Sequence, residues 1–169
     1  MFNINKKFLV VIFLLSISIV SACSQKTHKI GQLGSQHIHL DIKVYVDGAF
    51  VDFSQPQYQL RAKFVHFEDG RGDVVHVHAT GVTVADILDT LKIKFDQKCL
   101  TLNNGVKYCS DNVKTLNFFV NDLKNEDYGN YVVKNLDRIL ISYGSENQDQ
   151  IKKQLDSVTS NSAIYSGGK

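Results

Sequence analysis

The alternation of apolar and polar residues at positions 37–46 constrains the fold more than any other feature of this chain. The segment reads HIHLDIKVYV, with an apolar residue at every even-numbered position. This period of two is that of a strand with one buried face. Because side chains two residues apart lie on the same face of a strand, His37, His39 and Asp41 are predicted to share the other, solvent-facing side.

Residues 65–78 are predicted to form a hairpin that adds histidines to the same region. Apolar residues alternate again, and a turn at residues 70–72 joins the two halves. In the register that this turn implies, His66 lies opposite His76, and His78 lies on the same face. Five of the six histidines in the chain are thus expected on the outer face of one sheet.

These histidines predict a metal site. Neutral imidazole is the commonest protein ligand for zinc and copper, and two His-x-His strands side by side offer several nitrogens at chelating distance. The carboxylates of Asp41, Glu68 and Asp73 are candidates for an extra oxygen ligand or for orienting an imidazole. The alternative is a hydrated polar face that binds no metal. The candidate ligands are His37, His39, His66, His76 and His78.

Residues 1–22 are predicted to be a signal peptide. A short basic start precedes an apolar run at residues 8–20, which is too short for a comfortable transmembrane helix. Residues 20–23, VSAC, resemble the lipobox of bacterial and archaeal lipoproteins, in which Cys23 becomes the lipidated first residue of the mature chain. The alternatives are an ordinary cleavage site with an incidental cysteine, and an uncleaved signal anchor.

The remaining chain is predicted to hold one domain. Residues 23–36 are expected to be a lipidated, flexible tether, residues 37–158 a single globular domain, and residues 159–169 a disordered tail. Removal of residues 1–22 takes away two of the 19 basic residues and none of the 17 acidic ones. The mature chain is therefore neutral, and nucleic-acid binding is not expected.

Cys99 and Cys109 are predicted to form a disulfide. The residues between them have a hairpin pattern with a three-residue loop at residues 103–105, which places the two cysteines directly opposite each other. An exported protein meets the oxidising conditions in which such a bond persists. The alternatives are two free thiols, or two additional soft metal ligands.

Further hairpins are predicted along the chain. A two-residue turn at residues 47–48 is expected to pair Val44 with Val51 and Lys43 with Asp52. Additional strands are expected at residues 116–120, 131–133 and 138–143.

Two helices complete the predicted fold. Residues 83–86, TVAD, have the pattern of a capping box at the start of a short helix. Residues 145–148 are expected to cap a C-terminal helix whose apolar stripe contains Ile151, Leu155 and Val158. The predicted class is α+β, a mostly antiparallel sheet of hairpins with one short covering helix and a C-terminal helix.

Several short motifs together resemble an uncharacterised group of exported archaeal and bacterial proteins. They are HIH at 37–39, VDG at 46–48, HFED at 66–69, VVHVH at 74–78, and the segments 83–91 and 137–144. In that group the stretch that corresponds to residues 66–78 more often reads His-Thr-His-Asp and then Ile-His-Val-Glu. Here Glu68 takes the place of the second histidine, and His78 takes the place of the glutamate. The exchange keeps a set of histidines with a carboxylate, and the resemblance implies no established activity.

Residues 83–144 also resemble β-grasp domains of the ubiquitin and sulfur-carrier kind, so the sheet is expected to be β-grasp-like. The segment has a helix followed by a strand, a turn and a strand ending in DRILI. It departs from a carrier because Gly167 and Gly168 are followed by Lys169, so the terminal Gly-Gly tail is lacking.

The sequence favours a non-catalytic protein that binds Zn(II) or Cu(II) and is lipid-anchored on the extracytoplasmic face of a membrane. It has no nucleophile elbow, phosphate-binding glycine loop, zinc-protease helix or thioredoxin motif, and no organic cofactor is expected. A blue-copper site needs a free cysteine and usually a methionine, and residues 23–169 contain no methionine.

Two alternatives remain for the function. One is a metal-free interaction module that contacts another protein of the cell envelope. The other is metal-assisted hydrolysis with Glu68 or Asp73 as the general base.

Overall fold

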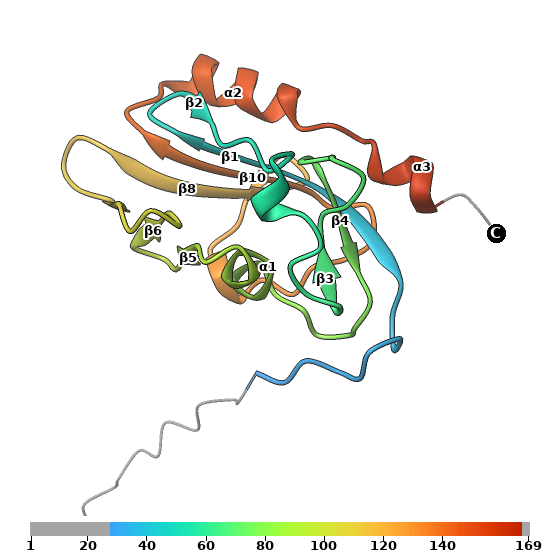
Figure 1. Cartoon of the computed structure of the whole chain (residues 1–169). Coiled ribbons are helices and arrows are strands. Elements are labelled where there is room, and N and C mark those ends of the chain that lie inside the picture. The colour runs from blue at the N-terminus through green and yellow to red at the C-terminus, as the bar shows by residue number, and fades with distance from the viewer. Residues whose placement is uncertain (1–27, 167–169) are drawn as a thin grey trace, which may run out of the picture.

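The computed structural model describes residues 28–166 of the 169-residue chain. The predicted signal peptide and Cys23 therefore lie outside the described residues. The fold is α+β, as predicted, and the larger of its two sheets has helices on both faces (Figure 1). Among residues 28–166, no helix is long and apolar enough to cross a membrane.

The larger sheet has the strand order β3-β4-β1-β10-β8-β9, and β2 also pairs with β1. Its strands are β1 (Ile38–Val46), β2 (Ala49–Phe50), β3 (Val65–His66), β4 (Val74–Val77), β8 (Thr115–Val120), β9 (Leu123–Lys124) and β10 (Arg138–Gly144). The smaller sheet consists of β5 (Lys94–Phe95), β6 (Cys99–Thr101) and β7 (Lys107–Cys109). Two short 3-10 helices lie at Pro56–Tyr58 and Tyr128–Asn130.

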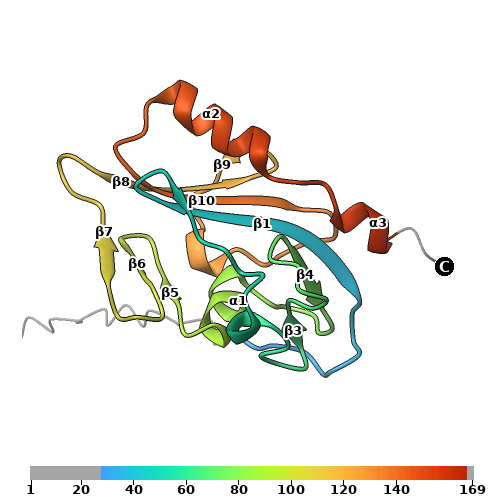
Figure 2. The ribbon, with the colours of Figure 1, turned by 45° about the horizontal axis from the view of Figure 1, so that its top comes forward.

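The centre of the larger sheet is a parallel pair, β1 and β10, with an antiparallel strand on either side. The helix α1 (Val84–Thr90) lies on one face, and α2 (Gln148–Ser157) lies on the other (Figures 1 and 2). Every even-numbered residue from Leu40 to Val46 is buried in the core on the α1 side, as the alternation predicts. Apart from the parallel β1–β10 pair, the sheet is antiparallel, as the sequence predicts.

The hairpin of β3 and β4 has the predicted register, because His66 lies opposite His76. The β1–β2 hairpin agrees only in part. Its turn residues Asp47 and Gly48 both have positive φ angles, 50° and 76°, as a tight hairpin turn requires. The register is the predicted one, and the Val51 amide donates to the Val44 carbonyl at 2.9 Å. However, β2 ends at Phe50, and the predicted strand pairing does not extend to Lys43 and Asp52. The Asp52 carboxylate instead accepts hydrogen bonds from Ser54 and Gln55.

The predicted capping box and disulfide are confirmed. The Thr83 hydroxyl accepts from the Asp86 backbone, and the Asp86 carboxylate accepts from the Thr83 backbone, so both ends of the box are satisfied. Cys99 and Cys109 lie directly opposite each other on β6 and β7 with an S–S distance of 2.13 Å. Residues 131–133, expected to form a strand, contribute only an isolated bridge from Val132 to Thr83.

Both ends of the described chain are more ordered than predicted. Residues 28–36, expected to belong to a flexible tether, lie along the segment after β4, where the Gly34 amide donates to the His78 carbonyl at 2.6 Å. Residues 159–166, expected to be disordered, include a third helix, α3 (Ser162–Ser166), that packs against β1. We refer to residues 159–166 as the C-terminal segment.

Candidate metal centre

Three neighbouring strands bring the histidines together. β4 lies between β3 and β1, so that His76 pairs with His66 on one side and with His39 on the other. The same β1–β4 register, in which Ile38 pairs with Val77, places His37 beside His78. All five candidate ligands therefore lie on one face of the sheet, which is the arrangement that a shared site requires.

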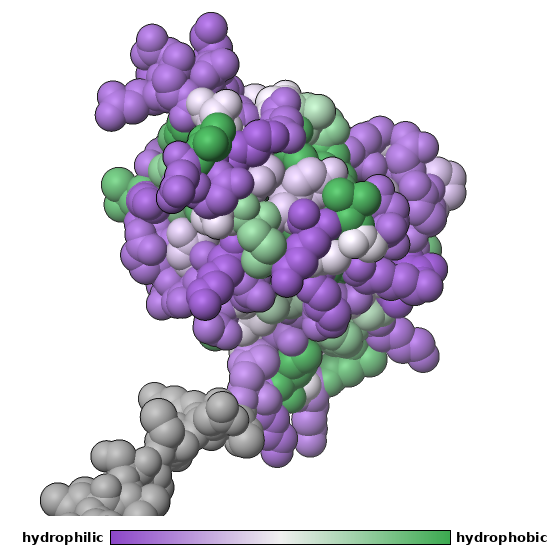
Figure 3. All heavy atoms as spheres, turned by 90° about the vertical axis from the view of Figure 1, so that its left-hand side faces the viewer, coloured by the Kyte–Doolittle hydropathy of each residue, from purple (hydrophilic) through white to green (hydrophobic). Residues whose placement is uncertain are grey.

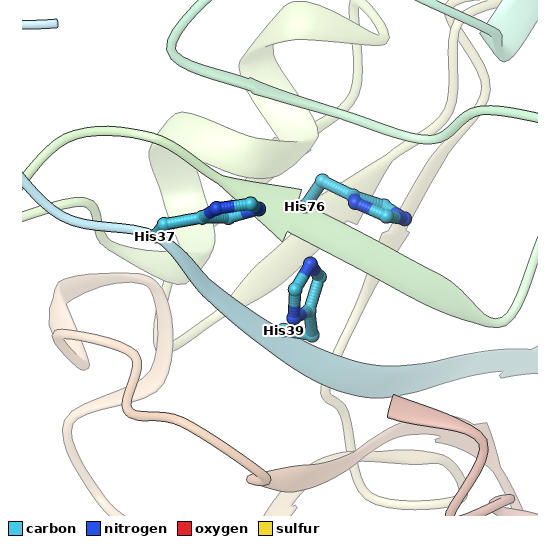
Figure 4. A group of neighbouring side chains, drawn as sticks. All are labelled: His37, His39 and His76. Carbon is cyan, nitrogen blue, oxygen red and sulfur yellow. The ribbon is translucent and has the colours of Figure 1, made fainter. Parts of the chain in front are cut away.

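His37, His39 and His76 form the tightest group. Each offers one ring nitrogen such that all three nitrogens lie within 4.8 Å of one another. Figure 4 shows the two rings from the start of β1 turned toward the ring from β4. Ligand atoms about 2.0–2.1 Å from a zinc ion are separated by roughly 3.3 Å in a tetrahedral site, so small rotamer changes suffice for chelation. We call these three residues the histidine triad.

The other two histidines adjoin the triad. The His78 ring lies 4.9 Å from that of His37, centroid to centroid, and 5.0 Å from that of His66. The His66 ring stacks on that of His76 at 6.0 Å. Glu68 contacts both, with one carboxylate oxygen 3.2 Å from Nε2 of His66 and the other 3.3 Å from Nδ1 of His76. Of the three carboxylates proposed from sequence, Glu68 is the one in contact with the histidines.

The remaining two carboxylates, Asp41 and Asp73, do not have the predicted role. Asp41 is fully buried, and it accepts hydrogen bonds from the Thr159 hydroxyl and from the backbone amides of Asn161 and Ser162. Asp73 accepts from the Asn161 side chain at 2.7 Å and from the Thr159 hydroxyl at 3.1 Å. The two carboxylates therefore hold the C-terminal segment against the sheet.

The C-terminal segment also covers part of the histidine face, which the sequence predicts to be open to solvent. The ring of Tyr165 lies 5.7 Å from that of His39 and 5.2 Å from that of His76, and both histidines are only 5% exposed. The Ser166 hydroxyl lies 3.2 Å from Nδ1 of His39. His37 remains exposed, so the site is open at one end and covered at the other.

Sequence reasoning did not identify Tyr165 or Ser166. The only signal is an aromatic residue within a short polar stretch, which has no helical or strand period to distinguish it from a disordered tail. His28, the histidine outside the proposed ligand set, hydrogen bonds Asp86 at 2.7 Å beside α1.

Burial keeps three of the histidines, His39, His76 and His78, in the form that binds metals. The pKa of His39 is lowered to about 4, first by desolvation and then by its histidine neighbours, and Glu68 only partly opposes this. Burial is also the largest cause that lowers the pKa values of His76 and His78. These imidazoles are therefore neutral at pH 7, with a lone pair available for a metal ion.

No family model matches this chain, and no curated protein or solved structure is significantly similar to it. The function must therefore be argued from the geometry of the histidine face. This face combines several neutral imidazoles, one carboxylate and one open side, a set that can hold a transition-metal ion.

Proposed function

We propose that this protein binds a divalent transition metal, Zn(II) or Cu(II), through the histidine triad without catalysing a reaction. The observation that carries the proposal is the convergence of three imidazole nitrogens, from two paired strands, within 4.8 Å of one another. Nitrogen ligands from histidine suit both of these metals, whereas magnesium and calcium prefer oxygen. Scavenging, sensing and assisting another protein are roles that fit such a site.

We further propose that the protein is exported and anchored to the outer face of a membrane by a lipid on Cys23. The supporting observations are the apolar run and the VSAC motif in the sequence, together with the resemblance to exported histidine-rich proteins. The Cys99–Cys109 disulfide supports export, because such bonds persist in oxidising compartments.

Metal analysis of residues 24–169, purified without a polyhistidine tag, tests the metal proposal. We expect bound zinc or copper, and calorimetric titration should show affinity for one or both ions. Replacing His39 by alanine should weaken the affinity at least about tenfold, since changes in the residues around a ligand already cost that much. His28→Ala is the matched control and should bind as the unchanged protein does. Failure of the unchanged protein to bind either ion would refute the proposal.

A second candidate is an interaction with another envelope protein. A groove of about 520 Å³ lies between α2 and the outer strands, and it is lined in part by Phe119, Ile151 and Leu155. Leu123, in β9 at this edge of the sheet, is 73% exposed. If this groove binds a partner, Leu155→Glu should abolish the interaction while leaving metal affinity unchanged.

A further inference from the structure

Glu68, His66 and His78 form a second group of potential ligands beside the triad. His66 on β3 lies opposite His76 on β4, and His78 directly follows β4. The rings of His66 and His78 are 5.0 Å apart, and Glu68 lies 3.2 Å from His66. None of these three residues belongs to the triad.

His66 is oriented as metal-binding histidines are. Its Nδ1 lies 2.8 Å from the carbonyl oxygen of Ala62, which can only accept a hydrogen bond, so Nδ1 must carry the proton. In the neutral ring, Nε2 then presents a lone pair. A ligating histidine commonly donates its other nitrogen to a backbone carbonyl in this way, which fixes the ring and its tautomer.

The partner of that lone pair is a carboxylate. Nε2 of His66 and an oxygen of Glu68 are both acceptors when the imidazole is neutral and the acid is ionised, yet they lie 3.2 Å apart. The same holds for the second Glu68 oxygen and Nδ1 of His76 at 3.3 Å, if that nitrogen is the unprotonated one. Such pairs are stable with a proton or a metal cation between them.

The separations fit a metal ion. Two ligand atoms about 2.0–2.1 Å from a tetrahedral zinc ion are roughly 3.3 Å apart. Both Glu68 contacts, at 3.2 and 3.3 Å, have this length before any rearrangement. Because the two oxygens point to different histidines, the carboxylate is placed as a bridge between the triad and the pair formed by His66 and His78.

We propose that the centre holds two divalent transition-metal ions, the second bound by His66, His78 and Glu68, with the Glu68 carboxylate shared between them. Carboxylates join neighbouring ions in two-metal sites, where the ions are about 3.5–4 Å apart. The proposal rests on metal binding by the triad, and it explains why five histidines rather than three gather on this face.

The test is the number of ions bound by residues 24–169, which contain all described elements, after loading with Zn(II) or Cu(II) and removal of excess metal. We expect two ions per chain. Glu68→Gln, at a side chain that is one-third exposed, and His66→Ala should each weaken binding of the second ion at least about tenfold and leave one ion per chain. Asp69→Asn, at the adjacent exposed carboxylate, is the control and should keep two.

The outcomes separate this inference from the proposed function. One ion in the unchanged protein would overturn the inference and leave the triad proposal standing, whereas none would overturn both. Two ions in Glu68→Gln and His66→Ala, with both variants folded by circular dichroism, would refute the assigned ligands. With two Cu(II) ions bound, electron paramagnetic resonance should show magnetic coupling between them, and two isolated signals would also overturn the shared carboxylate.

Discussion

His39 is the most deeply placed ligand of the triad, and its burial changes how protons compete with metal. An ordinary histidine has a pKa near 6.5 and becomes charged in mildly acidic solution. In this fold, loss of contact with water lowers the pKa of His39 to about 4. Protonation of this ring should therefore begin to oppose metal binding only in more acidic solution.

We accordingly predict that the contribution of His39 to metal affinity is the same at pH 7.5 and pH 5.5. The measurement is the ratio of affinities of the unchanged protein and His39→Ala at each pH. This ratio should not change, because the lowered pKa keeps the His39 ring neutral at both pH values. With a pKa of 6.5, only about one ring in ten would be neutral at pH 5.5, and the ratio would fall roughly tenfold. Such a fall would show that His39 is exposed in solution.

The C-terminal segment is the element that sets the environment of the triad. It places Tyr165 over His39 and His76, and it is attached through the buried carboxylate of Asp41. The ligands themselves, however, are all on or next to β1, β3 and β4. One part of the chain thus covers the triad, and a different part supplies the metal ligands.

Removal of residues 159–169 should therefore preserve metal binding but speed metal release. The triad keeps its strand positions, while the cover that keeps His39 and His76 only 5% exposed is lost. Stopped-flow transfer of zinc to a chelator would measure the release rate. Ser160→Ala, a change within the segment at an exposed residue, should release zinc as the complete chain does. An unchanged rate in the truncated chain would mean that the segment does not restrict access.

The disulfide is an element-scale feature with a separate energetic role. Cys99 and Cys109 close a loop with a sequence separation of 10 residues, and restricting this loop in the unfolded chain should stabilise the fold by about 2–3 kcal/mol. Urea denaturation of Cys99→Ser/Cys109→Ser should show this loss, with metal affinity retained because β6 and β7 belong to the smaller sheet. An unchanged free energy of unfolding would indicate that the disulfide does not stabilise the fold.

The sequence predicted correctly those elements that depend on residues close to one another in the chain. The His66–His76 register follows from the turn at residues 70–72, and the start of α1 follows from the Thr83 capping box. The burial of Asp41 could not be predicted in this way. Alternation shows that a residue is on the polar face of a strand, but it cannot show whether water or a polar segment from more than a hundred residues away covers that face.

At the scale of the whole molecule, hydrophobic and hydrophilic residues are mixed on the surface that Figure 3 draws. Figure 3 shows one face, on which hydrophobic residues form small separate patches among hydrophilic ones. Residues 23–169 carry equal numbers of acidic and basic side chains. The proposed membrane attachment therefore rests on the lipid at Cys23 and not on these two features.

Cys23→Ala should leave the precursor unlipidated and reduce the membrane-bound fraction. The supporting residues are 20–23, outside the part of the chain that the structure describes. Mass spectrometry of the mature protein should detect the lipid on Cys23, and fractionation of cells should show the change in the variant. A mature protein with an unmodified Cys23 would contradict the prediction.

The positions of the ligands and of their cover along the chain have a consequence for the order of folding. Every proposed ligand precedes residue 79, whereas Tyr165 comes near the end. β1, β3 and β4 can pair with one another early in folding, because they lie within a short stretch of chain. The ligand strands can thus take up an ion from the open side first, and residues 159–166 then close over a site that is already filled.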